Sequence, residues 1–409
     1  MQLGWIDFSK SERSKILSVL DLLQESGTLD ELGIAPVRDG FSNIFFPGTS
    51  TIQTRAKYFF IIPYILKDLE RSNISNPNDL RRKLDANERK CGEQLLKQNP
   101  NEIGIIGGRS LAQGRWVKRA PVEIYWNGLR QYQIFTFPHL TLAEYLRISA
   151  GMKKRKADLK KLGNRHDSTE ENECDDQDAG SSGSVHFWDI STHRDKWMDD
   201  LSMDLTPAEA AFLKEQIIAS HPSSMLGYIL RSNMREILEC DSFDSLSSLI
   251  EHFPEHIQQD YHLAQQFSHF LYIIRVVYNM ITSRQENQTA NKEYQALHPS
   301  FSEAADVDLG RIILRLGLSA NVPLCKFLHS AKSHILADDF DSLCKCIKDR
   351  EILLKGTGRA KTAHPGEYDP NAWFGGFYLD YRFSNALRIV RDIFESEVSV
   401  HAESESEPA

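Results

Sequence analysis

The stretch from Asp30 to Leu69 constrains the fold most, because apolar residues are concentrated in it more densely than anywhere else in the chain. Pro36 suits the first turn of a helix, and Pro47-Gly48 ends that helix. One of the hydroxyl residues at positions 49–51 can then cap a second helix, whose apolar residues from Ile52 to Leu69 form a wide surface. The stretch therefore predicts a buried helical hairpin that needs packing partners on several sides.

Polar residues lie among the apolar residues of this hairpin, where the pattern leaves no solvated stripe to hold them. They must pair with one another or face a partner. A second dense run, WFGGFYLDYRF at Trp373–Phe383, places an acid and a base beside a tight glycine turn, although aromatic residues at this density are typical of a core. The candidate polar site or partner surface comprises Arg38, Asp39, Gln53, Arg55, Asp380 and Arg382.

Composition indicates a soluble, multidomain protein. A chain of 409 residues exceeds what one core usually serves, so two or three domains are expected. The formal net charge of -9 argues against a protein that coats nucleic acid with its whole surface, while it leaves room for a local basic patch. The N-terminus lacks the pattern of a signal peptide, and the longest apolar run, Tyr58–Leu66, is too short to span a bilayer. We therefore expect a cytoplasmic protein without a membrane partner.

A polar segment divides the chain. From about Gly151 the sequence reads MKKRKADLKKLGNRH and then DSTEENECDDQDAGSSGS, a composition that cannot bury enough apolar surface to form a core. The predicted domains are an N-terminal helical domain with a small β element at 1–150, a charged flexible linker at 151–185, a C-terminal helical domain at 186–398 and a disordered acidic tail at 399–409.

Helix signals outnumber strand signals. Capping patterns begin helices at Ser9, Thr141 and Thr206, whereas β-branched residues and glycines between Glu102 and Gly114, and the run Ile134–Phe137, predict two short strands. Further helices are predicted at 207–220, 224–238, 245–253, 260–283, 301–316, 322–336, 339–354 and 384–395. The fold class is therefore mainly α with a minor β component in two domains, of which the C-terminal one is a helical bundle.

The segment Arg109–Arg130 mixes basic and aromatic residues, which suits phosphate contacts combined with base stacking. A strand, a basic turn, an aromatic helix and a second strand also follow the order of winged-helix domains, so the N-terminal domain could contain a winged-helix-like unit. The alternative is that the aromatics are core anchors and the arginines form local ion pairs. The candidate nucleic-acid-binding residues are Arg109, Arg115, Lys118, Arg119, Tyr125, Trp126 and Arg130.

No motif of a known catalytic class is present. Two further basic runs, 153–161 and KGTGRAK at 355–361, are typical of a solvated helix end and a flexible loop. The second lacks the GxxxxGK[ST] spacing of a phosphate-binding loop. The alternatives are that the first holds phosphate or a partner's acidic face and that the second contacts a nucleic-acid backbone. Cys344 and Cys346 would diverge by about 200° on a helix, so they do not form a metal site. HExxH, GxSxG and GxGxxG motifs are absent. We therefore assign no catalytic residue, no metal and no cofactor.

Several sequence blocks resemble an uncharacterised bacterial family of about this length. These blocks are GWIDFS at Gly4–Ser9, DELGI at Asp30–Ile34, FPGTSTIQTRAKYF at Phe46–Phe59, IYWNGLR at Ile124–Arg130, LTPAEAAFL from Leu205 and DYRF from Asp380. The resemblance implies a place in phage-defence gene clusters, beside Snf2-type helicases and phospholipase-D-like nucleases. It supplies no catalytic residues, because none is established for the family.

Three functions follow from these observations. The first is a non-enzymatic component of a bacterial antiphage defence system that binds DNA and assists partner helicase and nuclease subunits. The second is a protein-interaction scaffold without nucleic-acid contact, in which the Asp30–Leu69 hairpin and the helical C-terminal domain dock those subunits. The third is an enzyme of unrecognised type whose pocket would collect five polar residues: Arg38, Asp39, Gln53, Arg55 and Asp380.

Overall fold

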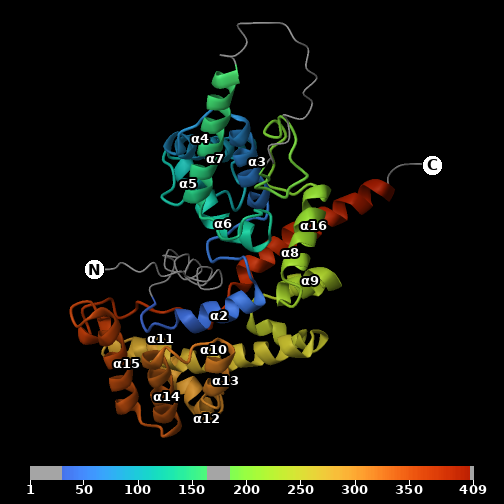
Figure 1. The fold of residues 1–409 in the computed structure, drawn as a ribbon. Coiled ribbons are helices and arrows are strands. Elements are labelled where there is room, and N and C mark those ends of the chain that lie inside the picture. The colour runs from blue at the N-terminus through green and yellow to red at the C-terminus, as the bar shows by residue number, and fades with distance from the viewer. Residues whose placement is uncertain (1–29, 164–184, 406–409) are drawn as a thin grey trace, which may run out of the picture. The chain divides into compact units, whose positions relative to one another are not determined.

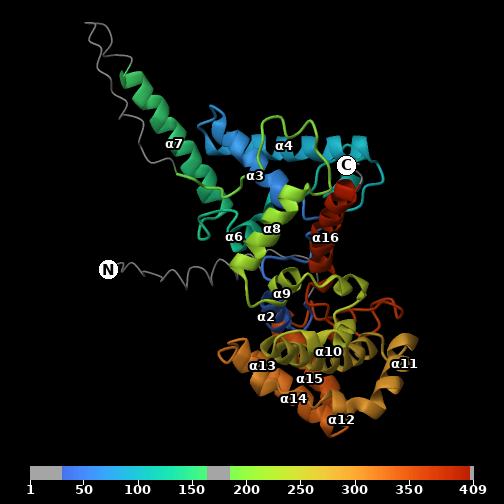
Figure 2. The same cartoon turned by 90° about the vertical axis from the view of Figure 1, so that its right-hand side faces the viewer.

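The computed structural model describes residues 30–163 and 185–405, and these residues are mainly helical (Figures 1 and 2). The helix predicted from Ser9 and the block GWIDFS lie outside the described residues, as do positions 164–184 of the predicted linker. The preceding part of that linker, residues 151–163, is helical.

The chain forms two compact units, each built from separated stretches of sequence. Of the described residues, unit 1 contains 48–163, 185–222 and 385–405, and unit 2 contains 30–47 and 223–384. The chain therefore passes from one unit to the other more than once, and the polar segment at 151–185 falls within unit 1.

Unit 1 contains seven α-helices among its described residues. They are α3 (Tyr58–Arg71), α4 (Pro77–Gln98), α5 (Gly108–Leu111), α6 (Pro121–Gln131), α7 (Leu142–Gly163), α8 (Pro207–Ser220) and most of α16 (Phe383–Glu405). The ends of several follow the sequence signals. Thr206 and Glu209 form the expected capping box of α8, with Pro207 at its first position, and Thr141 exchanges hydrogen bonds with Glu144 at the start of α7.

The core of unit 1 forms around α3 and an aromatic cluster. Every residue of α3 from Tyr58 to Leu66 is buried, so this helix has packing partners on all sides. Trp126 of α6 lies 4.7 Å from Phe135, ring centroid to centroid, and Phe135 lies 5.0 Å from Trp188. Trp188 belongs to the irregular aromatic segment at 185–206, which packs on α3 partly through a hydrogen bond of 3.0 Å from the Trp188 indole to Glu70.

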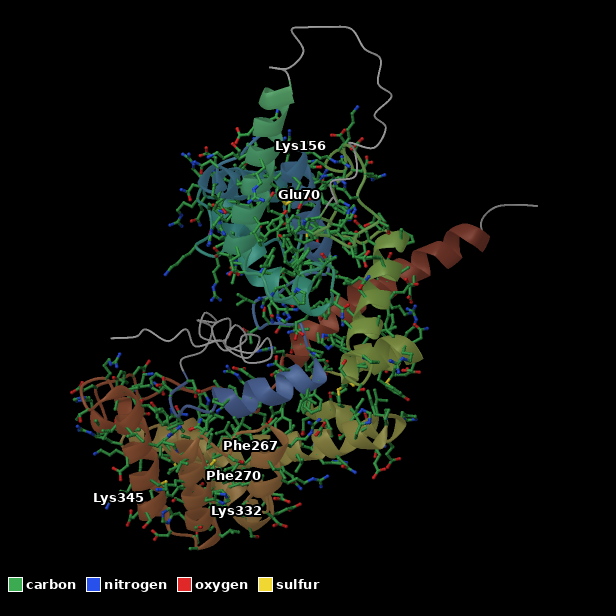
Figure 3. The ribbon with its side chains drawn as sticks, in the orientation of Figure 1. Glu70, Lys156, Phe267, Phe270, Lys332 and Lys345 are labelled. Atoms are coloured by element: carbon green, nitrogen blue, oxygen red, sulfur yellow. The ribbon has the colours of Figure 1, made fainter. Side chains whose placement is uncertain are left out.

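Unit 2 is a bundle of helices packed around the long helix α10. Its described α-helices are α2 (Ala35–Phe45), α9 (Met225–Ser232), α10 (Glu255–Thr282), α11 (Gln288–Leu297), α12 (Phe301–Ala304), α13 (Leu309–Arg315), α14 (Val322–Leu336) and α15 (Phe340–Lys355). Short 3-10 turns occupy Arg235–Glu239, Asp244–Ser248, Ile250–His252, His298–Ser300 and Lys361–Ala363. Phe267 and Phe270 of α10 are fully buried, whereas Lys345 is on the outer surface of the bundle (Figure 3).

The minor β component was predicted wrongly. The described residues contain no strand and one isolated antiparallel bridge, between Phe135 and Trp188. The segment around Ile103–Ile106 forms turns instead, because Gly104 and Gly107 adopt positive φ angles and the Ile106 N–H donates to the Tyr58 hydroxyl at 2.8 Å. A winged-helix-like unit needs strands that this part of the chain does not form.

Several helix predictions also need correction. The segments predicted as single helices at 224–238 and 301–316 each divide into two short helices. The second helix of the predicted hairpin begins only at Tyr58, without a side-chain cap, and α2 and α3 belong to different units. The segment predicted as one helix at 245–253 consists of 3-10 turns. The last helix, α16, runs to Glu405 and thus continues into the predicted disordered tail, of which 406–409 lie outside the described residues.

Glu88 gives the stability of unit 1 a pH dependence. Its buried carboxyl accepts the Val122 N–H at 2.7 Å, and burial raises its pKa to about 8. The folded protein therefore holds a proton at Glu88 that the unfolded chain releases near pH 4.5. Because the folded state binds more protons between pH 4.5 and 8, this group's contribution to stability is full below pH 4.5 and is lost as the pH rises through 8.

We expect Glu88→Gln, which mimics the protonated carboxyl, to match the wild type near pH 5 and to unfold at a higher temperature at pH 8. A difference of about 1 kcal/mol would shift the melting temperature by about 2–4 °C. Thermal unfolding followed by circular dichroism from pH 5 to 8.5 measures this. Glu93→Gln, at an exposed position of the same helix, is the control. Parallel pH profiles for all three proteins would contradict the expectation.

Candidate nucleic-acid interface

The predicted nucleic-acid-binding residues divide into a buried and an exposed group. Tyr125 is 0% exposed, and Trp126 and Arg130 are each 6% exposed. The Tyr125 hydroxyl accepts the N–H groups of Thr54 and Arg55 at 2.8 and 3.1 Å, and burial raises its pKa. The base-stacking role expected for Tyr125 and Trp126 does not fit this burial, because both rings anchor the core of unit 1.

The exposed group lies on α5 and the loop that follows it. Arg109, Arg115 and Lys118 are exposed, and Arg119 is half-buried. This loop rests on α4, because Gly92 leaves room for the side chain of Leu111 and the Arg89 guanidinium donates to the Gly114 carbonyl at 3.3 Å. Within the described chain no ion pair joins Arg109, Lys118 or Arg119 to an acid, so their charges are available to a ligand.

Positive charge is concentrated well beyond this loop. Residues 81–156 contain 16 Lys or Arg and 6 Asp or Glu, in a chain whose formal net charge is -9. Exposed basic residues of α4 and α7 add to those of the loop: Arg82, Lys83, Lys90, Lys97, Arg147, Lys154, Arg155 and Lys156. The far half of α7 extends away from α3, α4 and α6 in both ribbon views, and Lys156 lies near its end (Figures 1, 2 and 3).

The sequence reading missed the basic residues of α4 because acids are interspersed among them. Asp79, Asp85 and Glu93 divide the run, and each pairs with an arginine of the same helix. A charge count over a window of several helices would have found the excess, since it does not depend on a continuous basic run.

The predicted polar site is divided between the two units. Arg38, Asp39, Asp380 and Arg382 belong to unit 2, whereas Gln53 and Arg55 belong to unit 1. In unit 2, Arg38 pairs with Asp39 at 2.9 Å, and the Arg382 guanidinium lies 3.6 Å from the same carboxylate. Asp380 accepts the Ser384 N–H at 3.0 Å, which makes it a cap at the start of the last helix.

In unit 1, Gln53 and Arg55 stabilise an irregular backbone. The Gln53 amide donates to the Gly48 carbonyl at 3.1 Å and accepts the Ser50 N–H at 3.2 Å. Arg55 pairs with Glu102, Asp204 and Asp392 at 2.6, 2.9 and 2.9 Å. Burial alone would lower the pKa of Arg55. The three carboxylates have the larger combined effect, so the pKa is raised. Burial also raises the pKa of Asp392, to about 6.

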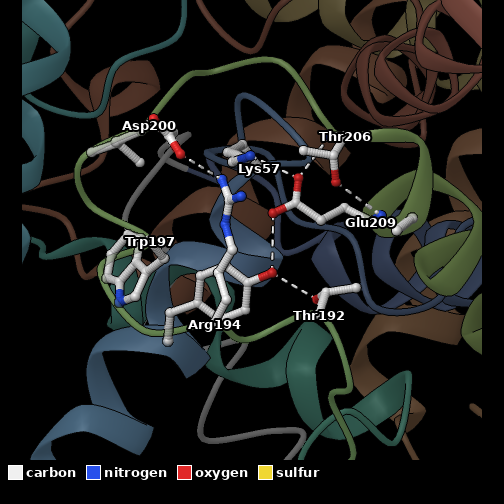
Figure 4. Close-up of a pocket in the computed structure, with 10 residues that line it drawn as sticks. Lys57, Thr192, Arg194, Trp197, Asp200, Thr206 and Glu209 are labelled. Atoms are coloured by element: carbon white, nitrogen blue, oxygen red, sulfur yellow. Dashed lines mark hydrogen bonds and ion pairs between the residues drawn. The ribbon is translucent and has the colours of Figure 1, made fainter.

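A pocket of about 270 Å³ in unit 1 contains a second buried polar cluster (Figure 4). The Lys57 ammonium lies 2.7 Å from Glu209, and the Tyr64 hydroxyl lies 2.6 Å from Thr192 and 3.1 Å from Glu209. Burial, with the charge of Glu209, raises the pKa of Tyr64, so this hydroxyl stays protonated and is not available as a general base. Since Glu209 also caps α8, the cluster connects α3, α8 and the segment at 185–206, and its groups satisfy one another.

The loop at 355–361 is anchored in unit 2. Lys355 and Lys361 both form ion pairs with Glu31, and the Lys361 ammonium lies over the Phe374 ring at 4.4 Å. Both lysines are therefore already paired with an acid of unit 2. Arg359 is the exposed cation of the loop.

The described residues contain neither a candidate metal site nor a membrane-spanning helix. In residues 30–163 and 185–405, no group of three or more His, Cys, Asp or Glu side chains is arranged to hold a metal ion. No helix in these ranges is long and apolar enough to cross a membrane.

Comparison with known proteins identified one family. Residues 1–169 match a family of unknown function (DUF6361). The comparisons with curated proteins and with solved structures found no match. The matched segment includes α3 to α7 and therefore the exposed basic residues of α4, α5, the loop at 112–119 and α7.

If the Lys57–Glu209 cluster is structural, Lys57→Met should destabilise the protein by about 3 kcal/mol, because it leaves Glu209 buried and unpaired. Arg194→Met is the matched control. Arg194 lines the same pocket, but its pair with Asp200 is exposed, so its loss should cost less than about 1 kcal/mol. Urea unfolding measures both values. Equal effects of the two variants would contradict a structural role for the buried pair.

Proposed function

We propose that this protein binds DNA through the exposed basic surface formed by α4, α5, the loop at 112–119 and α7. The concentration of positive charge in residues 81–156 of an acidic protein is the observation that supports the proposal. Exposed, unpaired cations such as Arg109 and Lys118 are free to neutralise phosphates, and each phosphate contact releases condensed counterions from DNA.

The arrangement favours contact with the DNA backbone over base recognition. Tyr125 is fully buried and Trp126 is 6% exposed, so neither ring presents a face on the outer surface on which successive bases of a strand could stack. Trp116 is the one aromatic residue of the loop at 112–119, and it is half-buried beside Gly92. Binding of this kind has little sequence preference, depends strongly on salt and positions the protein along the strand.

The biological setting comes from the resemblance described above. It implies an antiphage defence system in which the protein assists a helicase and a phospholipase-D-like nuclease. A non-enzymatic DNA-binding subunit is consistent with the basic surface and with buried polar clusters whose groups are already paired with one another.

A protein-interaction scaffold is the second candidate, and one surface of unit 2 favours it. Phe377 and Tyr378 are 57% and 46% exposed, and Phe377 stacks on Trp373 with ring centroids 5.1 Å apart. Exposed aromatic residues are enriched in protein interfaces. Partner binding that is retained after charge reversal of Arg115, Lys118 and Arg119 would favour this function.

The first test is binding of single-stranded and duplex DNA, measured by fluorescence anisotropy between about 50 and 200 mM salt. We expect affinity to fall steeply with salt. The variant Arg109→Glu/Arg115→Glu/Lys118→Glu should bind at least about tenfold more weakly and show a shallower salt dependence, because three phosphate contacts are lost.

The matched control reverses three exposed lysines of α14 and α15, Lys326, Lys345 and Lys348, which leaves the basic surface of unit 1 intact. This control variant should bind like the wild type. Absence of binding at 50 mM salt, or equal losses in both variants, would refute the proposal.

A further inference from the structure

A pocket of about 650 Å³ lies in unit 1 where α4, α6 and α7 meet. Its volume is within the range of small-molecule sites, which is roughly 300–1,000 Å³. Six of the residues that line it determine its chemistry: Arg81, Trp126, Arg130, Leu142, Leu146 and Arg147. The neighbouring helices therefore bring charged and apolar groups to one small volume.

Three arginines from three different helices line this pocket. Arg81 of α4 is fixed by Glu123 at 2.7 Å and by Asp85 at 3.1 Å. Arg130 of α6 is 6% exposed, and its guanidinium also donates to Asn127 at 3.3 Å. Arg147 of α7 is exposed and makes no ion pair in the described ranges. Among the described residues that line the pocket, Glu123 is the one acid beside these three arginines, so these side chains carry a net positive charge.

The start of α7 adds to this positive potential. The side chains of Thr141 and Glu144 each accept the other residue's backbone N–H. Leu142 and Ala143 also line the pocket. They are in the first turn of α7, where backbone N–H groups have no acceptor within the helix. The positive end of the helix dipole favours an anion at this position. Together with the arginine guanidinium groups, whose planar donors match phosphate oxygens, these N–H groups suit a phosphate.

An apolar wall faces the cations. The Trp126 indole is held in place by a hydrogen bond of 3.2 Å from its N–H to the Leu140 carbonyl and by the neighbouring Tyr145 ring at 5.8 Å. Leu142 and Leu146 complete the wall. A ligand that fills this pocket therefore needs a negatively charged end and a planar, apolar end.

We propose that this pocket binds a nucleoside phosphomonoester, with its phosphate between Arg130 and Arg147 and its base against Trp126 and the α7 leucines. Two sources share this chemistry: a free nucleoside monophosphate and the 5′-phosphorylated end of a DNA strand. The inference stands on the pocket alone and does not depend on the basic surface proposed above to bind DNA.

The test is isothermal titration of the full chain with AMP, GMP, CMP and UMP, beside the corresponding nucleosides. At least one monophosphate should bind, and its nucleoside should bind at least about tenfold more weakly, because it lacks the charge-assisted hydrogen bonds. Arg147→Gln, at an exposed position that folding does not require, should weaken the monophosphate at least about tenfold. Arg155→Gln, on the same helix outside the pocket, should leave the affinity unchanged.

Oligonucleotides with and without a 5′-phosphate separate the two sources. They are measured on Arg109→Glu/Arg115→Glu/Lys118→Glu, which removes the loop cations and leaves the pocket intact. A preference for the phosphorylated end that Arg147→Gln abolishes supports the strand end as ligand, and monophosphate binding without that preference supports the free nucleotide. No binding of any monophosphate at millimolar concentration, or equal binding of nucleoside and monophosphate, overturns the inference, whatever the result for the basic surface.

Discussion

Unit 1 depends on the ion pairs of Arg55. This one guanidinium reaches Glu102, Asp204 and Asp392, so it connects four stretches of chain that are far apart in sequence. Asp392 also accepts the Ala56 N–H at 2.7 Å, which fixes α16 to the backbone beside Arg55. Because the Arg55 and Asp392 side chains are only 17% and 6% exposed, their charges are costly when unpaired, and the stretches that carry them stabilise one another. The irregular segment at 48–57 thereby organises the helices of its unit.

The surface of unit 1 is basic because several of its acidic side chains are buried in internal contacts. Several of its acids are used inside the unit: Glu88 caps α6, Glu209 pairs with Lys57, and Asp392 holds Arg55. Each is less than 10% exposed, so it contributes little negative potential at the surface. Most lysines and arginines of α4 and α7, such as Lys90 and Lys154, have no comparable internal task and are exposed. An overall acidic composition is therefore compatible with a strongly basic local surface.

An element can be predicted from sequence when the residues that fix its ends are close together in the chain. The start of α8 is fixed by Thr206, Pro207 and Glu209, which are adjacent in sequence, and its prediction was accurate. The start of α3 is not fixed by residues adjacent in sequence. Residues 49–51 look like helix caps, but the N–H groups of Thr54 and Arg55 bond to the Tyr125 hydroxyl, some 70 positions away. A local pattern cannot reveal such a partner. For the same reason Tyr125 and Trp126, which lie among basic residues, could be read either as stacking platforms or as core.

The candidate site was only partly predictable for a related reason. Arg109, Arg115 and Lys118 occur close together in sequence, and their exposure agrees with the prediction of a local basic patch. Arg81, Arg130 and Arg147 come from three helices, and only the packing of α4, α6 and α7 brings them to one pocket. Helix α7 connects the two features. Arg147 lines the pocket, and Lys154 follows two turns later on the projecting part of the helix, about 10 Å further along its axis. A strand whose terminal phosphate occupied the pocket would meet the lysines of α7 directly, without any rearrangement of the unit.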